Sequence, residues 1–246
     1  MPIYKELSTK DVALIICFTA LYAVFASIPL FQVLGVPNKN ITAAAITAPI
    51  IGILLGPYIG VISATFGGII SFFAGSFFPP SFVSGIFASL CAGLIYRGKQ
   101  IWGILIYFSL LISLGFYPYI GPAWLFPLSM WFQIVGFLVL ISPLQSISSK
   151  SLKSSNNSSF LFGFFTISLI STLSGQISGS LTYVIIFPAP IGGWSVLWQG
   201  LTFLYPIERI IIALGSAFIG VPLLKVLRSA NLLQMSNRES QQERHV

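Results

Sequence analysis

The sequence predicts an all-α membrane protein, a polytopic bundle of about eight spanning helices. Of its 246 residues, 56% are hydrophobic and only 7% are charged, whereas about 25% of the residues in a soluble domain are charged. From Ile41 through Tyr96 there is no Asp, Glu, Lys or Arg. Apolar stretches of this kind favour helices that cross a bilayer, because a spanning helix needs about 20 mostly apolar residues. Too few charges remain to coat a water-soluble domain.

Glycine and proline divide the chain into separate apolar runs, because proline lacks an amide donor and restricts the residue before it. The clearest breaks are Gly56-Pro57 and Pro79-Pro80. We expect spans at about 12–34, 41–55, 58–77, 82–97, 101–117, 123–143, 160–187 and 206–228. A six-span bundle is the alternative, in which the second and third runs form one unit around a re-entrant Gly56-Pro57 turn.

One polar, low-complexity stretch, QSISSKSLKSSNNSS at 145–159, interrupts the apolar pattern. We expect it to be a flexible cytoplasmic loop between a first membrane part of about six spans at 1–144 and a second part of about two spans at 160–228. Both parts belong to the same bundle. Residues 229–246 are polar, and we expect them to form a disordered tail.

The distribution of Lys and Arg predicts the orientation of the chain. With eight spans, most of them fall on one side, at 5, 10, 97, 99, 150, 153, 225, 228, 238 and 244. Only Lys39 lies in a loop on the other side, and Arg209 lies inside the last span. An excess of Lys and Arg marks cytoplasmic loops, so we expect both termini in the cytoplasm and the protein in the plasma membrane. Scattered basic residues without a stripe exclude a nucleic-acid partner.

Enzyme chemistry has little support in the sequence. There is no P-loop, no HExxH, no GxSxG and no cluster of metal-ligand residues. Cys17 and Cys91 both lie in apolar runs, where inert thiols are expected. We therefore expect neither an enzyme nor a bound cofactor, and any dependence on ATP would have to come from a partner.

The run LLGPYIGVISATFGGIISFF, followed by FFPPSFVSGIFASLCAGLIYRGK, resembles the substrate-binding S component of energy-coupling-factor vitamin transporters. The matching positions are Gly56-Pro57-Tyr58-Ile59-Gly60 and Gly93-Leu94-Ile95-Tyr96. The last span, YPIERIIIALGSAFIGVPLLKVL, is similar to the closing helix of that family, so the resemblance covers mainly 12–98 and 206–228. It implies six spans and a membrane subunit that captures a small, vitamin-like molecule. Such a subunit works with a transmembrane coupling subunit and separate ATPase subunits.

Small residues at four-residue intervals form a ridge on the first span: Thr19, Ala23 and Ser27. In lipid, small side chains let two helix backbones approach closely. The family's paired-alanine motif takes the degenerate form Ala23 and Ser27 here. Two interpretations stay open: the ridge packs against neighbouring helices of the same chain, or it docks another membrane subunit.

Glu208 and Arg209 are the only charged residues inside an apolar span. A charge at that depth is costly and generally faces the bundle or a wet cavity. In a structural interpretation, Pro206 begins the helix, Glu208 interacts with the helix dipole and Arg209 extends to the interface. In a functional one, both residues form the polar floor of an outward-facing cavity. We expect that cavity to be bounded by Asn38, Trp124, Gln176, Trp194, Gln199, Glu208 and Arg209.

The sequence thus favours a substrate-capture subunit for a small molecule. A membrane structural or assembly subunit without a ligand is one alternative, since small residues also serve helix packing alone. An autonomous secondary carrier is another, although no inverted repeat or chain of intramembrane charges supports it.

Overall fold

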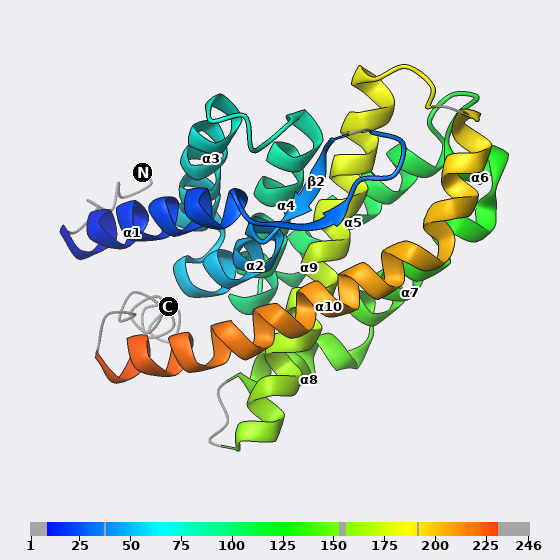
Figure 1. The fold of residues 1–246 in the computed structure, drawn as a ribbon. Helices are drawn as coiled ribbons and strands as arrows, with labels where there is room; N and C mark the ends of the chain where they lie inside the picture. Colours follow the sequence, from blue (N-terminus) through cyan, green and yellow to red (C-terminus); the bar gives the residue numbers. More distant parts are fainter. Residues whose placement is uncertain (1–8, 37, 153–155, 191, 231–246) are drawn as a thin grey trace, which may run out of the picture.

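The computed structural model of the protein describes residues 9–36, 38–152, 156–190 and 192–230, which are almost entirely helical (Figure 1). The helices are α1 (Thr9–Ala26), α2 (Ala44–Leu55), α3 (Pro57–Phe73), α4 (Pro79–Tyr96), α5 (Gln100–Gly115), α6 (Pro122–Leu125), the 3-10 helix η1 (Pro127–Met130), α7 (Trp131–Ile141), α8 (Pro143–Ser151), α9 (Asn157–Ile186) and α10 (Gly193–Ser229). Two short strands, β1 (Pro29–Gln32) and β2 (Asn40–Thr42), complete the fold. The all-α prediction is confirmed.

Within the described residues, four helices are long and apolar enough to cross a membrane: α1, α4, α9 and α10. A fifth span is possible if η1–α7 and α8 form one unit, although they are bent by 70° at Ser142. Three further apolar helices, α2, α3 and α5, are shorter. The chain therefore has the character of a multi-pass membrane protein, but fewer of its helices reach spanning length than the eight expected.

The first span ends earlier than the sequence predicts. Helix α1 stops at Ala26, and part of the apolar run to Leu34 enters a β-hairpin in which Pro29 pairs with Thr42 and Gln32 with Asn40. Gly35 and Asn38 in the hairpin turn have φ of 80° and 60°, a region that Gly and Asn tolerate better than other residues. The hairpin lies over the ends of α4 and α9 (Figure 1).

Two expected loops are helical instead. Residues 145–151, expected within a flexible loop, belong to α8, where Gln145 and Ser148 are buried. The stretch GWSVLWQG, expected before the last span, is the first part of α10, so Pro206 lies inside the helix rather than at its start. The helix-dipole interpretation of Glu208 is therefore wrong. The disordered tail expected at 229–246 lies, from residue 231 on, outside the described residues.

One end of the molecule carries most of the described basic residues, and we call it the basic end. Arg228 donates to the carbonyl oxygen of Leu152 at 2.8 Å and to the hydroxyl of Tyr96 at 2.7 Å. Lys225 donates to the side chain of Asn157, and Arg97 donates to the Leu55 carbonyl at 3.3 Å. These bonds bring together the C-terminal ends of α2, α4 and α10 and the start of α9.

The opposite end, which we call the hairpin end, is held by aromatic contacts. The Tyr183 hydroxyl donates to the carbonyl of Gly35 at 3.3 Å, joining α9 to the hairpin. The rings of Phe78 and Phe187 meet edge to face with centroids 6.2 Å apart. The chain therefore runs back and forth between the two ends, with α2, α4 and α10 pointing toward the basic end and α1, α3 and α9 away from it (Figure 1).

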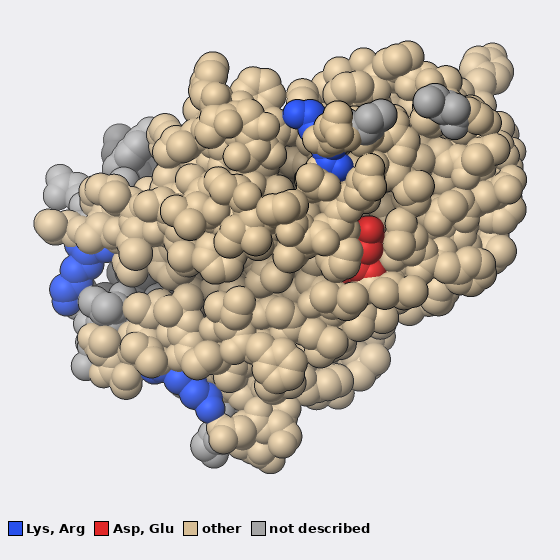
Figure 2. Space-filling model, in the orientation of Figure 1, with Lys and Arg blue, Asp and Glu red and all other residues tan. Residues whose placement is uncertain are grey.

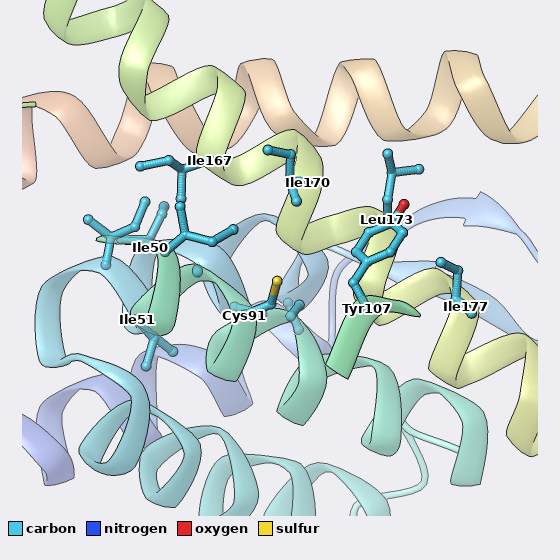
Figure 3. Close-up of a cluster of buried hydrophobic side chains, with 14 of the residues drawn as sticks. Ile50, Ile51, Cys91, Tyr107, Ile167, Ile170, Leu173 and Ile177 are labelled. Carbon is cyan, nitrogen blue, oxygen red and sulfur yellow. The ribbon is translucent and has the colours of Figure 1, made fainter. Parts of the chain in front are cut away.

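Helix α9 is the centre of the core. Ile167, Ile170, Leu173 and Ile177 are all buried along it. Figure 3 shows them among side chains from the surrounding helices: Ile50 and Ile51 of α2, Cys91 of α4 and Tyr107 of α5. Gly175 allows α9 to approach α4, because a Cβ there would lie 2.6 Å from the carbonyl oxygen of Ser84.

The outer surface is apolar over most of its area. Large exposed side chains include Phe66 and Phe73 on α3, Trp102 on α5 and Phe203 and Phe218 on α10. On the face seen in Figure 2, blue Lys and Arg atoms are confined to the molecule's edges and the hairpin, and red acidic atoms form one patch in a hollow over the middle of α10. A surface of this kind suits contact with lipid rather than water.

Candidate functional site

A cavity of about 100 Å³ lies between the hairpin and helices α1, α2, α4, α9 and α10. Its wall is rich in aromatic side chains: Tyr22, Phe77, Phe78, Tyr183, Trp198 and Tyr205. Its polar groups come from Gln32, Thr42, Ser81, Ser84, Thr172, Gln176, Ser180 and Arg209. Mostly apolar walls with a few convergent polar groups are typical of small-molecule sites.

Helix α10 contributes five of the residues that line the cavity, and four of them follow one face at helical spacing. Trp198, Leu201, Tyr205 and Arg209 lie three or four positions apart, so they follow one side of the helix. The unbroken course of α10 through Pro206 keeps the first three of these in line with Arg209. A helix that began at Pro206 would have separated Trp198 from this face.

Among the described residues that line the cavity, Arg209 is the only Lys, Arg, Asp or Glu. Its Nη2 lies 3.6 Å from Oε2 of Glu208, and both residues are buried, with exposed fractions of 4% and 2%. Arg209 Nε has no hydrogen-bond partner within the described residues. A buried guanidinium with a single long ion pair and a spare donor is incompletely satisfied, because Arg offers five N–H donors.

Gln176 reaches the cavity from α9 and is 6% exposed. Its neighbour is Gln133 of α7. With the Gln133 amide oriented to satisfy its surroundings, its nitrogen donates to the carbonyls of Ser129 at 3.1 Å and Met130 at 3.2 Å, and its oxygen accepts from Gln176 Nε2 at 3.1 Å. Gln176 Oε1 then remains without a partner in the described part of the chain.

The small residues of α9 serve both packing and the cavity. Gly175 and Gly179 allow close approach to Ser84 and Pro80 of α4. Gly179 and Ser180 also line the cavity, beside Gln176. Close packing of α4 on α9 therefore brings the polar groups of both helices to the same wall.

The structure brings together some of the residues predicted for the site. Gln176 and Arg209 line the cavity, and Glu208 contacts Arg209. Trp194 is buried beside the cavity wall, with its ring 5.6 Å from Tyr183 and 6.2 Å from Trp198, but it does not line the cavity.

Three predicted residues lie outside the cavity. Asn38 is exposed in the hairpin turn, Trp124 is 60% exposed on α6, and Gln199 is exposed on α10, where it donates to Ser195. Each belongs to the hairpin end as expected, but its position in a loop or on an outer helix face directs it away from the cavity.

Several residues that line the cavity were not among those predicted from the sequence to bound it. Tyr22 comes from α1, and Phe77 and Phe78 come from the turn before α4. Tyr205 lies four positions before Arg209, so the helical spacing around the intramembrane charges was the signal that could have identified it.

The predicted ridge has mixed surroundings. Thr19 is half-buried and donates to the carbonyl of Ser63 on α3 at 3.3 Å. Ala23 is half-buried, and Ser27 lies just beyond the end of α1 and is exposed. Thr19 thus packs within the chain, while Ala23 and Ser27 keep accessible surface.

No metal site is evident: among the residues that the structure describes, no group of three or more His, Cys, Asp or Glu could hold an ion. The described residues that line the cavity offer tyrosine and other hydroxyls, amides and one guanidinium. Comparisons with protein-family models, with curated proteins and with solved structures give no match.

Proposed function

We propose that the protein is a membrane subunit that captures a small organic molecule in the cavity beneath the hairpin and is energised by separate ATPase-bearing subunits. The observation that carries this proposal is a cavity with mostly aromatic and apolar walls whose lining includes two buried polar side chains, Arg209 and Gln176. Walls of this kind with a few polar groups are typical of sites that bind small organic molecules.

We propose further that the basic end faces the cytoplasm and the hairpin end faces outward. Lys and Arg residues accumulate on the cytoplasmic side of membrane proteins, and Arg97, Lys225 and Arg228 cluster at the basic end. The cavity would then receive its ligand from outside the cell. In this arrangement the short helices α2, α3 and α5 complete eight passes together with α1, α4, α7, α9 and α10.

Purification of the tagged full-length chain from its native membrane tests the proposal. We expect nucleotide-binding subunits to copurify and a small organic molecule to be released on denaturation and detected by mass spectrometry. The Arg209→Gln variant should release less of it, while Gln199→Met, which changes an exposed glutamine outside the cavity, should release the same amount.

Two other results would replace the proposal. Copurification of other membrane proteins without nucleotide-binding subunits or a bound small molecule would identify a structural or assembly subunit. Concentrative uptake by the purified chain alone in lipid vesicles, driven by an ion gradient, would identify an autonomous carrier.

A further inference from the structure

We propose that α8 is an interfacial helix that lies along an anionic lipid surface at the basic end, with Leu144 and Ile147 in the lipid and Lys150 among the headgroups. None of the described residues of α8 lines the cavity, so this role does not depend on ligand capture. Three features support it: the bend that precedes α8, the hydrogen bonds that fix its position in the bundle, and the division of its surface into apolar and basic strips.

The bend at Ser142 is set by the local sequence. Helix α7 ends at Ile141, and α8 starts at Pro143, with the two segments at an angle of 70°. Proline restricts the residue before it to extended conformations, and Ser142 has φ −79° and ψ 166°. The Ser142 hydroxyl accepts from the amide of Leu144 at 3.2 Å and so caps the new helix. One helix therefore ends here and another begins in a different direction.

The composition of the chain changes at the same point. Helix α7 exposes Ile134, Leu138 and Ile141 at helical spacing, a face that suits lipid. In α8, by contrast, six of the nine residues are Gln, Ser or Lys, which does not suit the core of a bilayer. Spanning helices tilt about 20° from the membrane normal. A segment bent by 70° from such a span therefore lies nearer to the membrane plane than to the normal.

Two hydrogen bonds hold α8 at the basic end. The Ser149 hydroxyl donates to the carbonyl of Ile95, in the last turn of α4, at 3.3 Å. Arg228 donates to the carbonyl of Leu152, directly after α8, at 2.8 Å. Both contacts lie where a long apolar helix ends, and Figure 1 shows α8 at the margin of the molecule. The helix is therefore placed at the level of a membrane surface.

The surface of α8 is divided into three strips. Gln145 and Ser148 are buried and form the strip that faces the bundle. Leu144 and Ile147 lie three positions apart and are 43% and 51% exposed. Lys150 follows Ile147 at the same spacing and is also exposed. Apolar and basic side chains side by side on the outer surface are typical of helices that lie about 5–10 Å deep in the headgroup region.

The charge of the protein surface favours an anionic lipid leaflet as the partner. Both acidic residues that the structure describes, Asp11 and Glu208, are buried, so every exposed charge in the described part of the chain is positive. Lys150 and Lys225 are exposed at the basic end. Anionic headgroups attract Lys and Arg residues near a membrane surface. In the orientation that we propose, this surface is the cytoplasmic leaflet, where anionic lipids are concentrated.

Fluorescence quenching measures where each strip of α8 lies. In a Cys17→Ser background, Ile147→Cys and the adjacent Ser146→Cys are labelled separately with the fluorophore NBD. The full-length protein is placed in nanodiscs of phosphatidylcholine and phosphatidylglycerol. We expect lipids brominated near the headgroup to quench the label at 147 about threefold more than the label at 146, and aqueous iodide to show the reverse order, because the apolar strip lies in lipid.

Two outcomes of the quenching experiment would overturn the proposal. Equal quenching of both labels by iodide would place α8 in water, and its apolar strip would then be free to contact a protein subunit instead. Strongest quenching at 147 by lipids brominated near the ends of their chains would place α8 in the bilayer core, as the continuation of the α7 span.

Charge variants test the headgroups. Native mass spectrometry measures the ratio of phosphatidylglycerol to phosphatidylcholine that stays bound to the protein. Lys150→Gln combined with Lys225→Gln should lower this ratio about threefold, because each basic residue near the surface adds to the attraction. Lys39→Gln, beside the hairpin turn, is the matched control and should leave the ratio unchanged.

Thermal unfolding midpoints in detergent check that the charge variants fold. If the double variant does not, Lys150→Gln alone should lower the ratio by about twofold. An unchanged ratio in the folded basic-end variants, or an equal fall in Lys39→Gln, would overturn the proposal.

Discussion

The indole nitrogen of Trp131, at the start of α7, donates a hydrogen bond to the main-chain carbonyl of Thr202 in α10 at 3.0 Å. That carbonyl needs an outside donor, because the residue four positions later is Pro206, which has no amide hydrogen. The Trp131 indole therefore replaces the amide donor that Pro206 lacks. It also ties α7, which carries Gln133, to the helix that carries Arg209.

A double-mutant cycle measures the coupling between the Trp131 hydrogen bond and Pro206. Trp131→Phe should destabilise the protein by about 1 kcal/mol, because the Thr202 carbonyl loses its partner in an apolar environment. In a Pro206→Ala background the amide of residue 206 can bond the same carbonyl, so the Trp131→Phe change should cost clearly less. Thermal unfolding midpoints in detergent check both values, and equal losses in the two backgrounds would show that the bond is not linked to Pro206.

The pair of Glu208 and Arg209 should respond asymmetrically to neutralisation. Glu208→Gln leaves a guanidinium buried without its ion pair, and breaking a buried pair costs about 3–5 kcal/mol. Arg209→Gln leaves a carboxyl group, which can be buried in its neutral form, so it should lower the unfolding midpoint less. The double variant should recover much of the loss caused by Glu208→Gln.

Ligand binding by Arg209→Gln gives a separate prediction. The variant should lose the released small molecule to a greater extent than it loses folded protein, because Arg209 lines the cavity. Size-exclusion chromatography measures the folded fraction, and mass spectrometry measures the bound molecule. A parallel loss of both would assign Arg209 to folding alone.

Gly175 should be sensitive to the smallest substitution. A methyl group there would lie 2.6 Å from the main-chain oxygen of Ser84, so α4 and α9 must separate to admit it. We expect Gly175→Ala to lower stability by about 1–3 kcal/mol. Gly200→Ala is the matched control, because its methyl group would come no closer than 3.8 Å to Leu34. A similar effect of both changes would contradict close packing at Gly175.

The proposed orientation is open to cysteine labelling. In a Cys17→Ser background, with Cys91 buried, Lys39→Cys should react with a membrane-impermeant maleimide on intact cells. Lys150→Cys should react only after permeabilisation, because position 150 lies two residues before Leu152, whose carbonyl accepts from Arg228 at the basic end. Labelling of both positions from the same side would refute the topology.

The accessible part of the ridge on α1 makes a prediction about assembly. Ala23→Leu adds bulk where another membrane subunit would approach, so complex formation should weaken while the isolated chain stays folded. Copurification measures assembly, and chromatography of the isolated chain measures folding. Intact assembly, or an unfolded chain, would assign the ridge to internal packing beside Thr19.

Composition was enough to predict a helical membrane protein, because a chain with few charges and long apolar runs suits helices in lipid and not a domain in water. Helix boundaries were harder. The hairpin was missed because Pro29–Gln32 continues the apolar run of α1, and strand pairing with Asn40–Thr42 depends on a turn that composition does not reveal. The early start of α10 was missed because Pro206 usually marks a helix boundary.

Site residues could be predicted where a polar or charged side chain lies within an apolar run. Arg209 and Gln176 stand out as polar groups in apolar surroundings, and both line the cavity. Asn38, Trp124 and Gln199 were predicted from their place in outer turns, but loop position alone does not say which way a side chain faces. Tyr22, Phe77 and Phe78 are ordinary apolar-run residues whose convergence depends on the packing of α1, α4 and α9.

The shortness of α2 changes how far a bound solute would have to travel. Ala48, which lines the cavity, and Leu55, whose carbonyl binds Arg97 at the basic end, are separated by seven residues of one helix. At about 1.5 Å per residue this is roughly 10 Å, against about 30 Å for the hydrocarbon core of a bilayer. In the orientation and capture function that we propose, a molecule bound beneath the hairpin would already have passed much of the barrier, and opening the remaining layer of protein would complete the crossing.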